Sequence, residues 1–306
     1  MTATRQNLSI SVAAGKGGTG KTLISASLAQ ALAVEYTAVQ VLDCDVEEPN
    51  CSILLHPEIT GREDVNILVP EVEMSKCIHC AKCAHVCEVG AIAAIGQAVL
   101  TFHDMCSGCG ACSFVCPTGA ITEVPLRVGE LSHGTASVPG GQSEIDFYEG
   151  RLDVGHQRAT PVTNATKATI SPEMITIVDA PPGTACPMQE AVADTDYCIL
   201  VTEPTPFGLA NLREAVDTCR RMEVPCGVVI NRDRDNDVEM GQYISEENLD
   251  VLMRVPERRS IAEAYSRGET LLSAQPEGSD EWREALLEMY ESIAETVAAE
   301  PAAPSA

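Results

Sequence analysis

The 306-residue sequence has few basic residues and no long apolar run. Twenty Lys and Arg residues stand against 45 Asp and Glu residues, so the formal net charge is −25. Because such a charge repels nucleic acid and anionic lipid headgroups, we expect neither of these as a partner. No run approaches the roughly 18 apolar residues of a membrane span. The first 15 residues lack a basic region followed by a cleavable apolar segment, so we expect a cytoplasmic protein.

Hydrophobic residues and cysteines are abundant. Hydrophobic residues make up 45% of the chain, which is enough for a packed core, and the length as a prior suggests about two domains. Eight of the fourteen cysteines lie between Cys77 and Cys116. In a chain without an export signal, this placement favours metal or redox chemistry over disulfides.

Apolar runs alternate with helically spaced segments along much of the chain. Strands are predicted at residues 8–14, 38–43, 65–70, 174–179, 197–202 and 227–231, and helices at residues 21–34 and 207–222. This alternation predicts an α/β fold with a doubly wound, mostly parallel sheet. Residues 131–141, rich in Gly, Ser and Pro, predict a loop or hairpin, and residues 301–306 predict a disordered tail.

One apolar stripe near the C-terminus has helical spacing. It predicts a last helix packed on the sheet, and the acidic opposite face argues against a membrane-binding helix. The stripe consists of Trp282, Ala285, Leu286, Met289 and Ile293.

A glycine-rich segment follows the first predicted strand and opens the first predicted helix, which is the context of a phosphate-binding P-loop. Its glycines let backbone N–H groups converge on a polyphosphate, and the helix N-terminus adds partial positive charge. Lys21 would reach the β- and γ-phosphates, and the Thr22 hydroxyl would bind Mg²⁺. The alternative is a glycine-rich turn that happens to precede Lys-Thr. The segment is Gly15, Lys16, Gly17, Gly18, Thr19, Gly20, Lys21 and Thr22.

With Lys16 in its second position, this loop resembles the deviant Walker A motif of the MinD/ParA/nitrogenase-iron-protein class of P-loop ATPases. The resemblance implies that ATP is bound and hydrolysed. It also implies that Lys16 crosses to the partner's nucleotide when two ATP-loaded subunits close, and hence that the protein is a homodimer.

Two acidic strand ends resemble the switch regions of the same class. By resemblance, Asp43 would support the Mg²⁺ shell and Asp45 would orient or deprotonate the attacking water, although both could instead be helix-capping or surface carboxylates. Asp179 ends the run ITIVD and would bind a Mg²⁺ water, while the Gly183 N–H would sense the γ-phosphate.

Two further positions match sites near the adenine in this class. They are Asn231, which closes the strand GVVIN, and Pro256. A strand-end cap and an ordinary turn proline are the alternatives for these two residues.

The eight clustered cysteines form two runs with the spacing C-x₂-C-x₂-C-x₃-C, typical of a two-cluster bacterial ferredoxin. In this motif the first three cysteines of a run bind one [4Fe–4S] cluster and the fourth binds the other. A zinc site or a disulfide framework are the alternatives. Glu88 replaces the proline that the motif places after the first run. The predicted ligand sets are Cys77, Cys80, Cys83 and Cys116 for one cluster, and Cys106, Cys109, Cys112 and Cys87 for the other.

The order of these parts places the ferredoxin motif between the two switch regions. We predict a discontinuous P-loop ATPase domain of residues 1–72 and 125–300, interrupted by an inserted ferredoxin domain of residues 73–124. The layout resembles MinD-superfamily ATPases with an inserted ferredoxin, which are relatives of Mrp-type carriers and of the nitrogenase iron protein. Cys186 lies seven residues after Asp179, the offset of a bridging-cluster cysteine in the iron protein, so it is a further candidate metal ligand. An unliganded thiol is the alternative.

Three functions follow from these parts. The first is an ATP-gated redox protein that passes electrons through two [4Fe–4S] clusters to a partner metalloprotein. The second is an ATPase that assembles or carries iron–sulfur or another metal cofactor. Some relatives accompany small proteins similar to nitrogenase-cofactor-binding proteins, so such an acceptor is one candidate. The third is a MinD/ParA-like positioning ATPase, against which the charge argues. The overall charge predicts that any partner presents a basic surface.

Overall fold

The structure is a computed structural model that describes residues 7–138, 143–234, 238–274 and 279–299. The predicted tail at residues 301–306 and part of the loop predicted at residues 131–141 lie outside these ranges. The strands are β1 (Ser9–Ala13), β2 (Val39–Asp43), β3 (Glu58–Val72), β4 (Ile92–Ile95), β5 (Ala98–Thr101), β6 (Ile121–Ser137), β7 (Glu144–Leu152), β8 (Ile175–Asp179), β9 (Tyr197–Thr202), β10 (Cys226–Asp233) and β11 (Val251–Pro256). The helices are α1 (Lys21–Glu35), α2 (Cys51–Leu55), α3 (Lys82–Val86), α4 (Ala111–Phe114), α5 (Thr160–Lys167), α6 (Cys186–Val192), α7 (Pro206–Arg221), α8 (Val238–Glu246), α9 (Arg259–Ser266), α10 (Leu271–Ala274) and α11 (Ser279–Ala299), with a 3₁₀ turn at His103–Met105.

A nine-stranded sheet in the order β11-β10-β9-β1-β8-β2-β7-β6-β3 forms the body. All pairings from β11 to β7 are parallel, whereas β6 pairs antiparallel with both β7 and β3. One buried core joins the sheet to α1 and α11, and a second joins its other face to α6, α7 and α8. The prediction of a mostly parallel, doubly wound sheet is therefore confirmed.

Helix α1 lies between the sheet and the C-terminal helices, so most of its circumference is buried. Twelve of its fifteen residues are buried, and small Ala and Ser side chains let it pack closely on both sides. On α11, Leu286, Met289 and Ile293 join the core, while Trp282 and Ala285 pack against it partly buried. The predicted last helix is confirmed.

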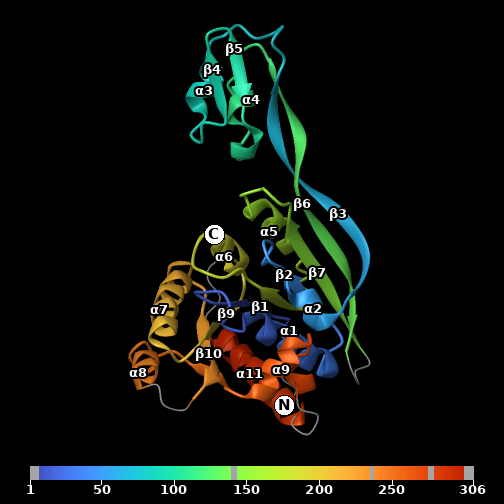
Figure 1. Ribbon diagram of the computed structural model, residues 1–306, viewed down its shortest axis with the longest axis vertical. Helices are drawn as coiled ribbons and strands as arrows, with labels where there is room; N and C mark the ends of the chain where they lie inside the picture. Colours follow the sequence, from blue (N-terminus) through green and yellow to red (C-terminus); the bar gives the residue numbers. More distant parts are fainter. Residues whose placement is uncertain (1–6, 139–142, 235–237, 275–278, 300–306) are drawn as a thin grey trace.

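Strands β3 and β6 form a long antiparallel ribbon that rises from the edge of the sheet (Figure 1). The strand predicted at residues 65–70 is only part of β3. Of the two alternatives predicted for residues 131–141, the hairpin agrees with the structure up to Ser137, because residues 131–137 belong to β6 and pair antiparallel with β7, and the loop does not. The glycine there serves close packing, not a turn, because a Cβ on Gly134 would lie 2.0 Å from the carbonyl oxygen of Glu58.

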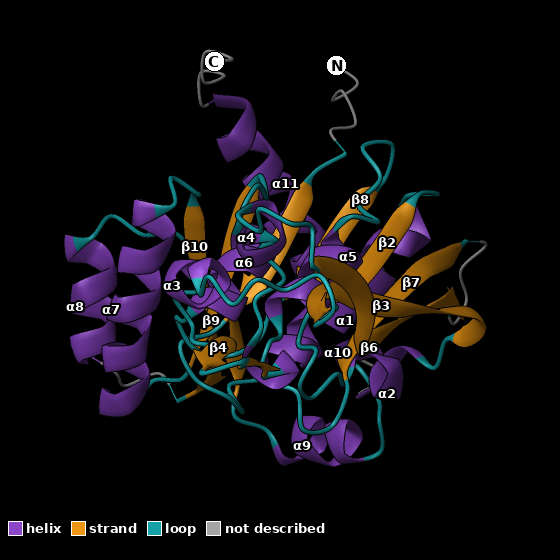
Figure 2. Ribbon diagram, turned by 90° about the horizontal axis from the view of Figure 1, so that it is seen from above, coloured by secondary structure: helices purple, strands orange, loops and turns teal. Residues whose placement is uncertain are grey.

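The ribbon carries a small lobe, residues 73–120, which holds α3, α4 and the β4–β5 hairpin. Because β6 pairs Ile121 with Val72, residues 121–124 belong to the ribbon. The lobe stands off the body along the long axis (Figure 1), and seen from above it overlies the region of α6 and β9 (Figure 2). Within the described ranges, no helix has the length and apolar character needed to cross a bilayer.

Candidate functional site

The glycine-rich loop joins the carboxyl end of β1 to the N-terminus of α1. Gly20 has a φ of 95°, in the left-handed region that favours glycine, and a Cβ there would lie 2.2 Å from Nδ2 of Asn231. The Asn231 amide donates to the carbonyl oxygen of Thr19 at 2.7 Å. Asn231 at the end of β10 therefore holds the loop in place, and the loop needs glycine at position 20.

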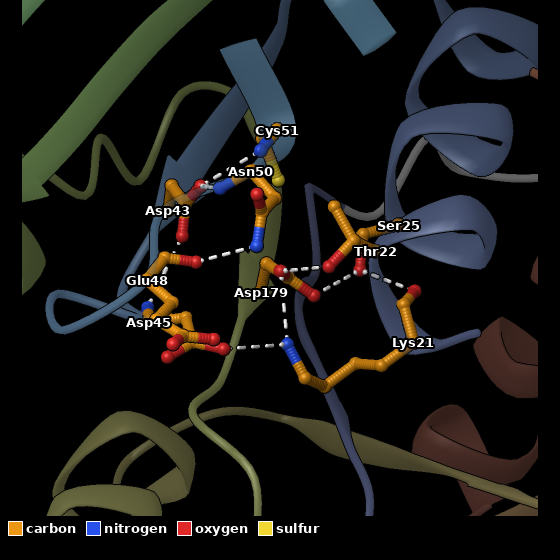
Figure 3. Close-up of polar contacts among 9 residues, drawn as sticks. All are labelled: Lys21, Thr22, Ser25, Asp43, Asp45, Glu48, Asn50, Cys51 and Asp179. Atoms are coloured by element: carbon orange, nitrogen blue, oxygen red, sulfur yellow. Dashed lines mark hydrogen bonds and ion pairs between the residues drawn. The ribbon is translucent and has the colours of Figure 1, made fainter. Parts of the chain in front are cut away.

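Asp179, at the carboxyl end of β8, is the fully buried centre of the site (Figure 3). Its Oδ2 accepts from Lys21 Nζ at 3.0 Å and from Thr22 Oγ1 at 2.9 Å. Its Oδ1 accepts from Ser25 Oγ at 2.7 Å. One carboxylate thus joins three side chains of α1.

Asp43 lies opposite Asp179 in the pairing of β2 with β8 and is also fully buried. It accepts from the backbone N–H groups of Asn50 and Cys51, each at 2.9 Å, and from that of Asp45 at 3.1 Å. Asp43 therefore caps the start of α2, as the alternative interpretation allowed, while it faces the centre of the site. Burial and then the charge of Asp179 raise the pKa of Asp43.

Asp45 and Lys21 approach each other at 3.5 Å beside this pair of carboxylates. Burial raises the pKa of Asp45 to about 6, although the charge of Lys21 opposes that rise. Burial alone would lower the pKa of Lys21, but the neighbouring carboxylates, Asp179 first, outweigh it and hold that pKa above its usual value. Lys21 is thus a fixed positive charge beside the acidic cluster that Asp43, Asp45 and Asp179 form.

The oxygen atoms gathered here suit a hard divalent cation. One carboxylate oxygen of Asp43, one of Asp179 and the sulfur of Cys51 all lie within 4.8 Å of one another. Thr22 adds a hydroxyl oxygen at Asp179. Mg²⁺ prefers carboxylate, hydroxyl and water oxygens, and a cation would relieve the repulsion between two buried carboxylates. The residues present fit Mg²⁺.

A cleft of about 560 Å³ opens beside the loop. Its lining includes Gly18, Gly20, Asn231 and Pro256, so the two residues predicted near the adenine lie next to the predicted phosphate loop. Gly183 is placed differently, because its N–H donates to the carbonyl oxygen of Ala14 at 2.9 Å. In this structure that N–H is engaged by the backbone and does not point to a γ-phosphate.

Lys16 is held within its own chain. Its Nζ lies 3.0 Å from Oε2 of Glu203, and Arg232 lies 2.5 Å from the other oxygen of the same carboxylate. The Lys16 side chain is 28% exposed, and its Nζ lies 5.7 Å from the ring centroid of the exposed Phe207. Lys16 is therefore bound to Glu203 at the surface and does not contact the acidic cluster of Asp43, Asp45 and Asp179.

The lobe contains two small cavities. Each cavity is lined by three cysteines of one run and the fourth cysteine of the other run. One cavity is lined by Cys106, Cys109, Cys112 and Cys87, and the other by Cys77, Cys80, Cys83 and Cys116. The fold thus groups the eight cysteines in the same two sets that the motif predicts.

Comparison with known proteins identifies the family of the chain. A family model described as the CobQ/CobB/MinD/ParA nucleotide binding domain matches residues 10–271. The chain belongs to this family. MJ0579, an uncharacterised protein of Methanocaldococcus jannaschii, is 31% identical over 276 residues, which cover 86% of this chain and 91% of that protein. MJ0578 of the same organism is 31% identical over 235 residues, covering 76% and 80%.

Solved structures of the MinD/ParA type share the fold. The cell division ATPase MinD of Pyrococcus furiosus aligns with a TM-score of 0.56 at 19% identity, covering 94% of this chain and 99% of MinD. MinD of Pyrococcus horikoshii, solved with Mg-ADP, aligns with a TM-score of 0.54 at 19% identity, covering 96% and 98%. The chain therefore has the fold of these MinD ATPases and, by its family, is a nucleotide-binding protein of the CobQ/CobB/MinD/ParA family.

Sequence analysis missed two residues of this MinD/ParA-family site. Ser25 lies one helical turn after Lys21, a spacing that places both on one face of α1. Glu203 directly follows β9, and the carboxyl end of a parallel strand is where ligands of such sheets bind. These signals were present in the sequence, but the pairing of Glu203 with Lys16 spans 187 residues.

The other cysteines of this family member are scattered. Cys186 is exposed at the first position of α6, among the residues described it has no second thiol partner there, and it stays a candidate only. Cys44 and Cys51 are buried near Asp43 and Asp179, and burial raises the pKa of each thiol.

Proposed function

We propose that this MinD/ParA-family ATPase is an iron–sulfur protein in which nucleotide state and closure of a homodimer gate electron transfer to a partner metalloprotein. Two [4Fe–4S] clusters in the lobe would carry the electrons. The observation that supports this most strongly is the pair of four-cysteine cavities on a ribbon that rises from a P-loop ATPase body.

The surroundings of the cysteines fit cluster-bound thiolates. Backbone N–H groups already point at three sulfur atoms: Ala91 N at Cys87 (3.2 Å), Ala120 N at Cys116 (3.3 Å) and Gly108 N at Cys106 (3.4 Å). Such N–H···S bonds stabilise thiolates and tune the potential of a cluster. When bound, each cluster would accept and release one electron.

The two cysteine runs also share a backbone conformation. Glycines at positions 108 and 110 have a φ of 71°, and the equivalent residues of the first run, His79 and Ala81, have a φ of 58°. Non-glycine residues rarely adopt this conformation, which costs about 1 kcal/mol or more. The loops are held in the shape that wraps three thiolates around a cavity, which favours clusters over a disulfide framework. We propose that the inserted ferredoxin domain predicted at residues 73–124 is the lobe of residues 73–120 together with the first ribbon residues 121–124, and that residues 1–72 and 125–300 form the ATPase domain.

In the ATPase body, the geometry supports distinct roles for the site residues. Lys21 and the backbone of residues 15–20 would bind the phosphates, Thr22 with Asp43 and Asp179 would hold Mg²⁺, and Asp45 would position or deprotonate water. Lys16 would leave Glu203 and cross to the partner subunit's nucleotide. Gly183 would report the γ-phosphate only after its bond to Ala14 breaks.

A chain of contacts links the water-positioning residue to the lobe. Val46, directly after Asp45, is 1% exposed and packs with Val65 of β3, Val128 of β6 and Val162 of α5. Its carbonyl oxygen accepts from Leu152 N at 2.8 Å. A shift of Asp45 on hydrolysis would therefore press on the base of the ribbon.

The loop after β7 completes this link. Asp153 is joined to Arg127 of the ribbon at 2.9 Å, and its N–H donates to the Val128 carbonyl at 3.0 Å. At the other end of the loop, Arg158 donates to the carbonyl oxygen of Met105, the residue before Cys106. The loop thus bridges the ribbon base and one cysteine cavity, which supports gating by nucleotide state.

Two other functions share these parts. In an iron–sulfur or metal-cofactor carrier, the clusters themselves or a metal at Cys186 would leave, and Cys80, Cys109 and Cys186 are exposed enough for such a release. A nitrogenase-cofactor-binding type of acceptor belongs to this second possibility. The MinD-like fold is equally consistent with a positioning ATPase, since the likeness shows the fold alone.

An anaerobic experiment separates the three. The reconstituted protein is reduced, its EPR spectrum is recorded with Mg-ATP or Mg-ADP, and methyl viologen or an apo-ferredoxin is then added. Nucleotide-dependent loss of electrons with iron retained supports the redox function, whereas iron appearing in the apo-ferredoxin supports the carrier. ATP turnover without effect on either contradicts both and leaves positioning.

A matched pair of variants tests the gate. Arg158→Ala should keep iron and ATP hydrolysis but lose the nucleotide effect on electron release. Arg267→Ala, which removes an exposed arginine paired with Glu269 in the body, should leave that effect intact.

A further inference from the structure

The β4–β5 hairpin of the lobe has two unlike faces. Its register pairs Ala93 with Leu100 and Ile95 with Ala98, which puts these four side chains on one face, because directly paired residues share a face. Ile92 and Val99 point to the other face. The hairpin is therefore a single β-layer whose two sides can be assigned separately.

The inner face covers both cysteine cavities. Ile92 lines the cavity of Cys87 and Cys106, and Val99 lines the cavity of Cys77 and Cys116. Any group that docks on the outer face is then separated from both cysteine sets by the thickness of one sheet.

The outer face is apolar and uncovered. Ile95 is 64% exposed and Leu100 is 44% exposed, and Phe102, two residues further on, is 45% exposed. The four paired side chains of this face include no polar or charged group. Of the 15 large hydrophobic side chains exposed in the described part of the chain, eight lie in the lobe. An apolar concentration of this kind marks an interaction site.

The charge of the lobe differs from that of the whole chain. Residues 73–120 contain two lysines against three acidic residues, a net charge of −1, while the chain carries −25. The acidic residues lie almost entirely on the body. Two [4Fe–4S]²⁺ clusters, each bound by four thiolates, would add about −2 apiece, so the loaded lobe would carry about −5. The basic partner surface therefore stays a prediction for the surroundings of the clusters, while the outer face of the hairpin itself offers no charged group.

The size of the face decides what kind of partner fits. Two four-residue strands make a face of roughly 13 Å by 10 Å, far below the roughly 800 Å² per partner of a stable interface. Weak electron-transfer encounters lie at this small end. These points favour a transient partner over a stable dimer.

We infer that the outer face of the β4–β5 hairpin, built on Ile95 and Leu100, is the docking surface for a redox partner protein that presents an apolar patch. The inference rests on the proposed redox function. One electron passes across the hairpin, so the lobe is oxidised by one electron, a one-electron acceptor in the partner is reduced by one, and no bond or proton is exchanged.

Voltammetry of the full-length, reconstituted protein tests this with surfaces of known chemistry. Gold electrodes carry either a methyl-terminated or an amine-terminated alkanethiol layer. The test variant is Ile95→Gln/Leu100→Gln, and Val238→Gln is the control, since Val238 is 80% exposed on the body. The wild type should exchange electrons on the methyl surface with little dependence on salt. The double variant should be slower by about tenfold, given about 0.8 kcal/mol for each buried CH₂ that is lost, and the control should be unchanged.

Three results would overturn the inference: an unchanged double variant, exchange only on the amine surface with strong salt dependence, or a wild-type dimer in sedimentation velocity that the double variant abolishes. The last would make a second copy the occupant. Iron content and EPR are recorded first. Wild-type protein that holds no iron refutes the proposed function itself, which separates that failure from failure of the docking surface.

Discussion

The ion pair between Lys16 and Glu203 predicts how readily two subunits close. In the proposed dimer, Lys16 crosses to the partner subunit's nucleotide, so each subunit must first break its 3.0 Å contact with Glu203. Both side chains are partly buried, at 28% and 10% exposure, so the pair contributes about 1 kcal/mol, the upper end for surface pairs. Two such pairs per dimer oppose closure by about 2 kcal/mol, or a factor of about 30 in the dissociation constant.

Glu203→Gln removes this restraint and should tighten ATP-dependent dimerisation by about 30-fold. Sedimentation velocity over a concentration series, with Mg²⁺ and a non-hydrolysable ATP analogue, measures the dissociation constant. Glu247→Gln is the matched control, because it removes a carboxylate paired with Arg220, near the C-terminal end of α7, whereas Lys16 lies beside Phe207 at its start. Unchanged or weaker dimerisation of Glu203→Gln, with nucleotide affinity intact, would refute the assignment of Glu203 as a restraint on Lys16.

Three further predictions concern the two sites. Burial raises the pKa of Asp45 to about 6, and the residue acts only when deprotonated, so kcat/KM for ATP should fall as the pH drops through about 6. Asp45→Asn should lose both activity and this pH dependence. A pH dependence that persists in the variant would assign the titration to another group. Gly20→Ala should weaken nucleotide binding by at least about tenfold in a fluorescent-ADP titration, because its Cβ would lie 2.2 Å from Asn231 Nδ2; wild-type affinity would show that the loop can shift. Ala81→Gly should slow loss of iron to a chelator by relieving about 1 kcal/mol at a φ of 58°, and faster loss would contradict the strain argument.

The local parts of this fold could be predicted from the sequence. The strand at residues 197–202 coincides with β9, and the phosphate loop lies between β1 and α1 as its glycines indicate. Both depend on short patterns of apolar residues and glycines. The grouping of the cysteines into two cavities matches the repeated spacing, since three ligands of each set are close in sequence.

The long-range parts could not be predicted. Residues 131–137 contain Gly, Ser and Thr, and their composition leaves a loop and a hairpin open. Their pairing with β3 as well as with β7 depends on Gly134, which permits a close approach to Glu58. Glu203 contacts Lys16 only because β9 lies beside β1 in the sheet. In each case a neighbour far away in the sequence sets the role of the residue.

The most direct test of the account is the metal content and redox response of the anaerobically purified chain. Two [4Fe–4S] clusters require about eight iron and eight sulfide atoms per chain. The account predicts this stoichiometry, together with an EPR spectrum of the reduced protein that differs between Mg-ATP and Mg-ADP. Zinc in place of iron, or two clusters whose spectra and electron release ignore the nucleotide, would contradict it.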